Sequence, residues 1–266
     1  TGGGETFLVN LIERLARLDT KNEYLLIVTD ANARIFATSN PRFSQYVALP
    51  SAQSRLRRLW FEYQSLPHLL KREGVDLYYS PFGTLPYGLP CKSAVTFQNL
   101  LYIDFANSTP FRGRTPLGWL KITLQALYYK TTTRSTMRRA DRIWAVSNTT
   151  ANALSDNYEV PPSKIEVIYE GVSIEQFHPE RQNDLPERPF AGRYVLMVAS
   201  LYPNKNIDKA ICAFRNVVDR GMPHHLLIVG NDWHHYRKEL EKLVKRLHLE
   251  ERVHFVGGVK HEEIPA

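Results

Sequence analysis

Segments typical of strands and of helices alternate along almost the whole of this 266-residue chain. Short apolar runs with β-branched residues predict buried strands, and apolar residues at three- and four-residue spacing predict helices between them. Such alternation predicts an α/β fold, with a parallel sheet covered by helices on both faces. The predicted strands cover residues 24–29, 45–49, 76–81, 93–99, 141–147, 164–172, 194–199, 224–230 and 253–258.

A change of composition divides this pattern into two predicted domains, residues 1–173 and 194–266. Residues 174–193 are rich in charge and proline, and their apolar residues show neither helical nor strand spacing, so we predict a linker there. A strand is expected before the first helix, and the second domain has only about three strands, too few for a complete doubly wound sheet. We therefore expect the first strand and part of the C-terminal domain to be missing.

Composition narrows the classes of protein. With 43% hydrophobic residues the chain can bury a full core, and no apolar run approaches the roughly 18 residues of a spanning helix. The N-terminus has no signal-peptide pattern, so a soluble, cytoplasmic protein is expected. Cys91 and Cys212 fall in different predicted domains, which fits a reducing compartment. No cysteine or carboxylate completes a set of metal ligands with the histidines, so no metal site is expected.

Lys205 stands where a predicted strand gives way to a predicted helix. Pro203 and Asn206 are turn formers nearby, and Asn206 can cap the helix. The ammonium group and the helix-end amides would then face one small volume that suits a phosphate. Gly230 and Gly257 also end predicted strands, the edge at which open parallel sheets bind ligands. The alternative is a solvated surface lysine.

Two further segments suggest binding surfaces. Gly2, Gly3 and Gly4 directly precede a predicted helix, and such a loop lets a ligand approach the backbone, although a flexible chain end is the alternative. Residues 105–140 contain seven basic residues and no acidic one, interleaved with apolar side chains. This segment predicts a basic amphipathic helix suited to an anionic membrane surface or acidic acceptor, or else an ordinary packed helix with a solvated face.

Several motifs, taken together and in this order, resemble one enzyme family. They are LYYSPFGTLP (77–86), VTFQNLLYID (95–104), AVSNTTANALSDNYEVPPSKIEVIYEGVSIEQFHP (145–179), VLMVASLYPNKNIDKAICAF (195–214) and LLIVGN (226–231). The family is the retaining glycosyltransferases of family four, also called glycosyl transferases group 1. Its members have two Rossmann-like domains facing each other across a cleft, the B-type fold.

The resemblance implies transfer of a hexose-type sugar from a nucleotide-sugar donor to a glycan, lipid-linked or small-molecule acceptor. The C-terminal domain would hold the donor and the N-terminal domain the acceptor, without a metal or a covalently bound cofactor. Lys205 would stabilise the charge that develops on the leaving diphosphate. The implied site residues are Lys205 and Gln98 as catalytic, Gly3, Gly4, Ser200, Asn206, Gly230, Gly257 and Val259 as donor-binding, and Gln98, Asn99 and Tyr102 on the acceptor side.

The chain departs from the family pattern at two of these positions. Many members carry an arginine at the position of Ser200 and a histidine at that of Gln98. Glutamine can hydrogen-bond a hydroxyl but cannot act as a base, so Gln98 would position rather than transfer protons. The family's paired glutamates would fall beyond Ala266, and little turnover is therefore expected from this chain alone.

Two other readings stay open at this point. A sugar-nucleotide epimerase of the same architecture would bind the same donor without needing an acceptor. A non-catalytic module would use residues 105–140 to dock on anionic lipid or nucleic acid, although no recognised nucleic-acid reader motif is present. As a glycosyltransferase, too, the protein could contact the inner face of a membrane peripherally through residues 105–140.

Overall fold

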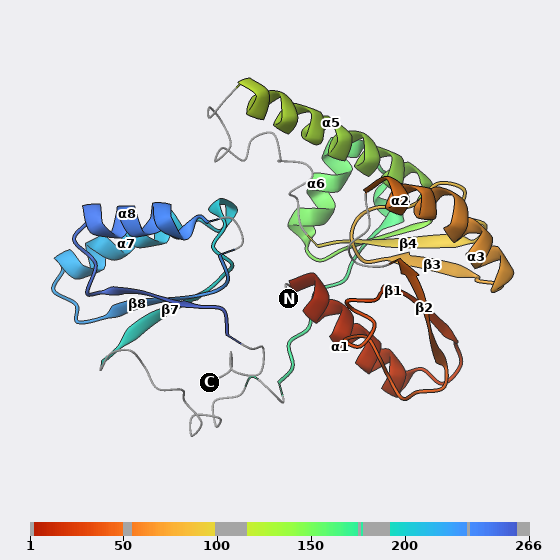
Figure 1. Cartoon of the computed structure of the whole chain (residues 1–266), viewed down its shortest axis with the longest axis horizontal. Helices are drawn as coiled ribbons and strands as arrows, with labels where there is room; N and C mark the ends of the chain where they lie inside the picture. The colour runs from red at the N-terminus through yellow and green to blue at the C-terminus, as the bar shows by residue number, and fades with distance from the viewer. Residues whose placement is uncertain are drawn as a thin grey trace. The chain divides into compact units, whose positions relative to one another are not determined.

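The computed structural model divides the chain into two compact units, Thr1–Glu170 (unit 1) and Gly171–Ala266 (unit 2). The structure describes residues 3–49, 55–98, 116–174, 177, 192–232 and 235–259. Every strand pair in either unit is parallel (Figure 1). The predicted α/β class is therefore confirmed. Most of the predicted linker lies outside the described residues.

Unit 1 contains two parallel sheets, one ordered β1-β2 and the other β3-β4-β5-β6. A short π-helix, η1, joins α2 to α3, and a 3-10 turn, η3, precedes the last strand. The elements are α1 (Gly3–Leu18), β1 (Tyr24–Thr29), β2 (Phe43–Leu49), α2 (Arg55–Trp60), η1 (Phe61–Ser65), α3 (Leu66–Arg72), β3 (Leu77–Ser80), β4 (Lys92–Phe97), α5 (Pro116–Arg139), β5 (Arg142–Ala145), α6 (Asn148–Tyr158), η3 (Pro162–Lys164) and β6 (Ile165–Val167).

The core of unit 1 forms where helices α5 and α6 meet the larger sheet. Leu154 from α6 and Met137 from α5 are fully buried in one cluster with Val95 and Ile143 of the strands. A second cluster places α3 against both sheets, because Leu70 belongs to a group that includes residues of β1, β2 and β3. The two sheets are thus tied together through apolar side chains.

Unit 2 has a single sheet, ordered β7-β8-β9. Two helices, α7 and α8, lie on one side of this sheet (Figure 1) and bury Ile211 and Leu240 against Ile228. The elements are β7 (Tyr194–Val198), the 3-10 turn η5 (Pro203–Lys205), α7 (Ile207–Asp219), β8 (His225–Val229), α8 (Arg237–Arg246) and β9 (Val253–Gly257).

Strand β7 is less buried than its apolar sequence predicts. Leu196 and Val198 are 45% and 50% exposed, whereas a strand covered on both faces was expected. The reason is topological. β7 is an edge strand of this sheet, and among the described residues the packed helices contact the opposite face. The continuous apolar sequence of β7 predicted a strand covered on both faces, whereas the described residues cover only one of its faces.

Two predicted boundaries were also wrong. The helix at the N-terminus begins at Gly3, so Gly3 and Gly4 lie within its first turn rather than before it. Glycine takes up helical and non-helical backbone conformations alike, so a run of glycines does not by itself mark where the helix begins. The last strand of unit 1 ends at Val167 instead of continuing to Val172. Its partner β5 ends at Ala145, which pairs with Val167 and whose carbonyl accepts the Ile168 N–H at 2.9 Å just beyond the paired residues.

Candidate functional site

The carboxyl ends of the three strands in unit 2 are joined by backbone hydrogen bonds. Ala199 N–H donates to the Val229 carbonyl at 2.9 Å, and Gly230 N–H donates to the Gly257 carbonyl at 2.8 Å. A Cβ atom added to Gly230 would lie 2.0 Å from the carbonyl oxygen of Ala199 and 3.0 Å from the backbone nitrogen of Ser200. The predicted donor-side residues Ser200, Gly230 and Gly257 therefore lie together, and only glycine fits in the middle.

Lys205 and Asn206 form the turn that leads from this edge of the sheet into α7. Lys205 is the last residue of η5 and its side chain is exposed. Asn206 occupies the N-cap position in the left-handed conformation, with φ 53° and ψ 33°. Its side chain makes no capping hydrogen bond, so the expected cap was wrong. Among the described residues, no side chain accepts from the first-turn amides of α7, which lie beside a lysine, and this arrangement suits an anion.

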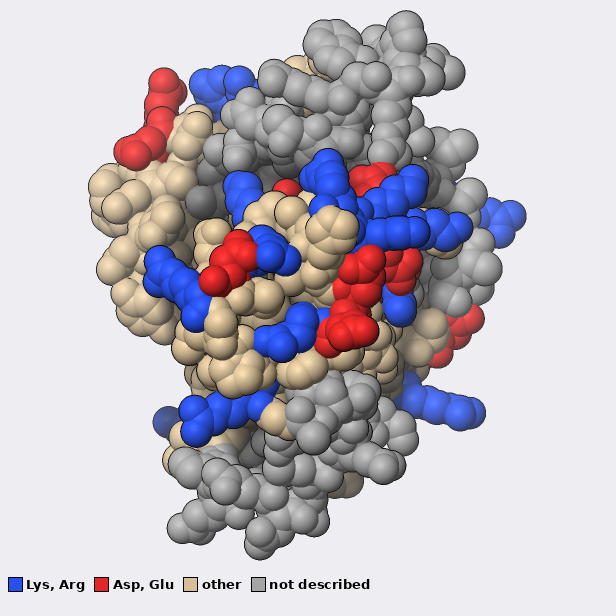
Figure 2. Space-filling model, turned by 90° about the vertical axis from the view of Figure 1, so that its left-hand side faces the viewer, with Lys and Arg blue, Asp and Glu red and all other residues tan. Residues whose placement is uncertain are grey.

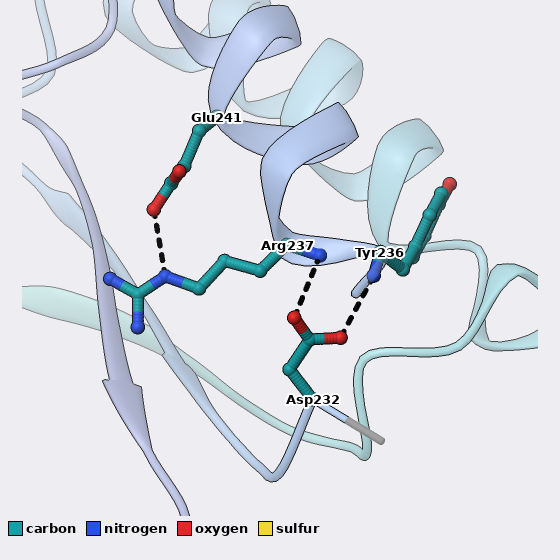
Figure 3. A network of polar contacts seen from close by, with 4 residues as sticks. All are labelled: Asp232, Tyr236, Arg237 and Glu241. Atoms are coloured by element: carbon teal, nitrogen blue, oxygen red, sulfur yellow. Dashed lines mark hydrogen bonds and ion pairs between the residues drawn. The ribbon is translucent and has the colours of Figure 1, made fainter. Parts of the chain in front are cut away.

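The start of α8 differs, because an acidic side chain already occupies it. Asp232, in the loop after β8, accepts hydrogen bonds from the backbone N–H groups of Tyr236 at 2.8 Å and Arg237 at 3.3 Å (Figure 3). The Arg237 side chain pairs with Glu241 one turn along at 2.7 Å. Sequence reasoning missed Asp232, although an aspartate shortly before a helix is a recognisable signal. Of these two helices, α7 is the one left open to an anion.

Unit 1 brings together Gly4, Phe82 and Gln98. A Cβ atom on Gly4 would lie 3.0 Å from Cε1 of Phe82 and 3.4 Å from Oε1 of Gln98. Gln98 follows β4 and Phe82 follows β3, so both stand at the carboxyl edge of the larger sheet. The start of α1 therefore meets the ends of two strands, and the sequence motifs did not reveal the part played by Phe82.

The Gln98 amide has an unusual environment. Its Nε2 atom is buried and has no hydrogen-bond partner among the described residues. Burying an amide donor without an acceptor costs roughly 1–3 kcal/mol, so such a group is a candidate ligand contact. Gly3 has open space where a Cβ would stand, and Val259 is 36% exposed beyond β9. Asn99 and Tyr102, predicted on the acceptor side, lie outside the described residues.

The histidine pair of unit 2 lies away from this edge. Nδ1 of His225 and Nε2 of His254 are 2.8 Å apart, near the amino ends of β8 and β9. Burial lowers the pKa of both rings and so favours their neutral forms. Within the described ranges, no group of three or more His, Cys, Asp or Glu residues is placed to hold a metal ion. No helix in the described part of the chain is both long and apolar enough to cross a membrane.

Comparison with known families matches both halves of this architecture. Residues 1–176 match the family described as Glycosyltransferase Family 4, and residues 181–266 match Glycosyl transferases group 1. The chain belongs to glycosyltransferase family 4. These matches confirm the family resemblance that the sequence motifs of the family 4 chain indicated.

Individual relatives are more distant. The O-antigen chain mannosyltransferase RfbU of Salmonella typhimurium is 26% identical over 141 residues, which are 53% of this chain and 36% of that protein. The match thus spans about a third of the length of that curated relative. HepE from Anabaena, solved with UDP and glucose, has a TM-score of 0.60 at 18% identity, over 99% of this chain and 67% of its own.

A second structural relative is WaaG, a glycosyltransferase involved in lipopolysaccharide biosynthesis. Its TM-score is 0.63 at 15% identity, over 99% of the family 4 chain and 69% of the WaaG chain. At these identities the likeness concerns the fold. It confirms the predicted glycosyltransferase B-type architecture, built from two Rossmann-like domains.

Proposed function

We propose that the whole protein transfers a hexose-type sugar, with retention of anomeric configuration, from a nucleotide-sugar donor to a glycan, lipid-linked or small-molecule acceptor. The observation that carries the proposal is the open first turn of α7 next to Lys205, at the carboxyl edge of the sheet in unit 2. Membership of family 4 supports it. HepE, which shares the fold, was solved with UDP and glucose.

The chemistry of sugar transfer fits these residues. When the bond between sugar and diphosphate breaks, negative charge develops on the phosphate oxygens. The Lys205 ammonium and the first-turn amides of α7 would stabilise that charge as it appears in the transition state. Ser200 supplies no charge, so Lys205 carries a larger share of the stabilisation than it would beside an arginine. We propose that these groups, rather than a metal ion, bind the diphosphate.

The residues of unit 1 would serve the other side of the reaction. The buried Gln98 Nε2 would donate a hydrogen bond to a hydroxyl of the donor sugar or of the acceptor, and Gly4 lies beside the other amide atom, Oε1. A glutamine has no titrating group, so its contribution is orientation. The free cysteines Cys91 and Cys212 fit a reducing compartment, and we propose that transfer takes place on the cytoplasmic side.

Nucleotide binding by the chain tests this function. Isothermal titration with UDP, GDP and ADP would identify the preferred base, and Lys205→Gln should weaken binding of that nucleotide by roughly tenfold or more, because a charge-assisted contact to phosphate is lost. Lys242→Gln is the matched control, since Lys242 is an exposed lysine of the same unit that lies in α8 rather than in the first turn of α7. Failure to bind all three nucleotides, or equal losses in both variants, would contradict the proposal.

A further inference from the structure

Helix α5 carries an apolar stripe on a side that the described residues of unit 1 leave exposed. Leu124, Leu127 and Tyr128 are 58%, 57% and 54% exposed. Helical periodicity places them opposite Thr133 and Met137, which are buried in unit 1. A surface helix normally turns its apolar stripe toward the core, so this stripe is directed to something else.

The neighbouring segment of α2 and η1 carries two exposed aromatic side chains, and one of them, Tyr63, lies near Tyr128 of this stripe. Trp60, at the end of α2, is 66% exposed, and Tyr63 follows it in η1. The Tyr63 ring stacks on Tyr87 with centroids 5.5 Å apart. Burial raises the pKa of Tyr63, and the nearby Tyr128 phenol raises it further, which places α5 beside η1. Exposed tryptophan and tyrosine are typical of surfaces that meet the boundary between lipid and water.

The charges on α5 have one sign. No acidic residue occurs from Phe105 to Ala140, and Lys130, Arg134 and Arg138 are exposed on the helix. Arg134 meets Glu159 at 3.7 Å, but both side chains are solvated, so this pair neutralises little of the charge. The face of α7 and α8 differs, because acidic and basic side chains are interspersed there (Figure 2).

We propose that this surface docks on a lipid bilayer with anionic headgroups. The α5 face is defined as Leu124, Leu127, Tyr128, Arg134 and Arg138, with the exposed Lys130 at its edge, about 60° around the helix from Leu127. Its apolar members would enter the boundary between headgroups and acyl chains, while the cations meet the headgroups. Nucleic acid would engage the cations but leave both leucines without a partner, and a second copy would bring like charges together. The inference rests on this surface alone and goes beyond the proposed sugar transfer.

Cosedimentation with vesicles tests the docking surface. The chain should bind vesicles of phosphatidylcholine mixed with phosphatidylglycerol, bind less as salt rises, and bind poorly to phosphatidylcholine alone. The triple variant Lys130→Gln, Arg134→Gln, Arg138→Gln should bind about a hundredfold more weakly, since each basic residue near such a surface contributes roughly fivefold. The double variant Leu124→Gln, Leu127→Gln should lose roughly tenfold at every salt concentration.

The matched control removes the same charge from the other unit. Lys238→Gln, Lys242→Gln, Lys245→Gln alters three exposed lysines of α8 and should change vesicle binding less than about twofold. Circular dichroism and nucleotide titration of each variant would show that folding and the donor site are intact. Equal losses in the α5 and α8 triple variants would overturn the proposal. So would binding to duplex DNA without binding to vesicles, or self-association through the α5 face without binding to vesicles.

Discussion

Helices α6 and α7 each follow a parallel strand, but their first turns are completed in different ways. At α6 the Ser147 hydroxyl accepts the Thr150 N–H at 3.1 Å, and Ser147 has the extended conformation usual for an N-cap. At α7 the N-cap residue Asn206 is left-handed and makes no such bond. A helix start that its own chain completes stabilises the fold, whereas one left open can bind an anion.

The same contrast separates the glycines of the two units. A side chain on Gly4 would press on the Phe82 ring, which can move, while one on Gly230 would meet backbone. Gly230 therefore holds the strand ends of unit 2 in place, whereas we propose that Gly4 leaves space beside Phe82 for a ligand. The predictions below test this division between residues that build the fold and residues that leave room for a ligand.

The largest effect is expected from Gly230→Ala. The added methyl group would lie 2.0 Å from the Ala199 carbonyl oxygen, so backbone must move, and unit 2 should lose about 3 kcal/mol or more of stability. Urea denaturation, monitored by hydrogen exchange of unit 2 peptides, would measure this loss of stability. Gly221→Ala is the control, because that glycine is left-handed but has nothing within 4 Å, and about 1 kcal/mol is expected there. Equal costs would show that the close approach is unimportant.

Pyrophosphate should distinguish the two helix starts directly. At a concentration ten times its Kd it should stabilise unit 2 by about 1.4 kcal/mol and leave unit 1 unchanged, because binding to the native state alone shifts the unfolding equilibrium. Thermal unfolding combined with hydrogen exchange of α6 and α7 peptides would measure this. Lys205→Gln should reduce the stabilisation. Equal protection of both helices would remove the contrast.

Ser147→Ala should destabilise unit 1 by about 1 kcal/mol, the usual cost of removing a side-chain cap. The Thr150 N–H would lose its acceptor, and exchange at the start of α6 should speed up accordingly. Asp232→Ala should cost unit 2 a similar amount through the start of α8. Neither change should alter pyrophosphate binding, and a loss of that binding in Ser147→Ala would contradict the assignment.

The smallest effect is expected from Asn206→Gly. Because the asparagine side chain makes no capping bond and its backbone is left-handed, glycine should change the stability of unit 2 by no more than about 0.5 kcal/mol. Urea denaturation would check this. Asn206→Ala, which cannot take the left-handed conformation cheaply, should cost about 1 kcal/mol more than glycine. An effect of glycine as large as that of Ser147→Ala would mean that α7 is capped after all.

The sequence by itself determined the local structure and its order. Alternating patterns located the strands and helices within a few residues, and the ordered motifs were enough to assign the family. Lys205, Gly230 and Gly257 could be singled out as candidates because residues at strand ends need particular backbone freedom or charge, which is visible in residue type. These are local properties, so one sequence suffices to express them.

The tertiary structure alone decided which groups are left without a partner. Ser147 and Asn206 are both good capping residues, and residue type did not distinguish them. In the structure Asn206 is left-handed and its backbone N–H donates to the Pro203 carbonyl at 3.1 Å, while its side chain makes no capping bond. The meeting of Gly4 with Phe82 and Gln98, and the exposed apolar stripe on α5, likewise join or separate residues far apart in sequence. Burial and partnership depend on contacts between distant segments, and residue type does not encode those contacts.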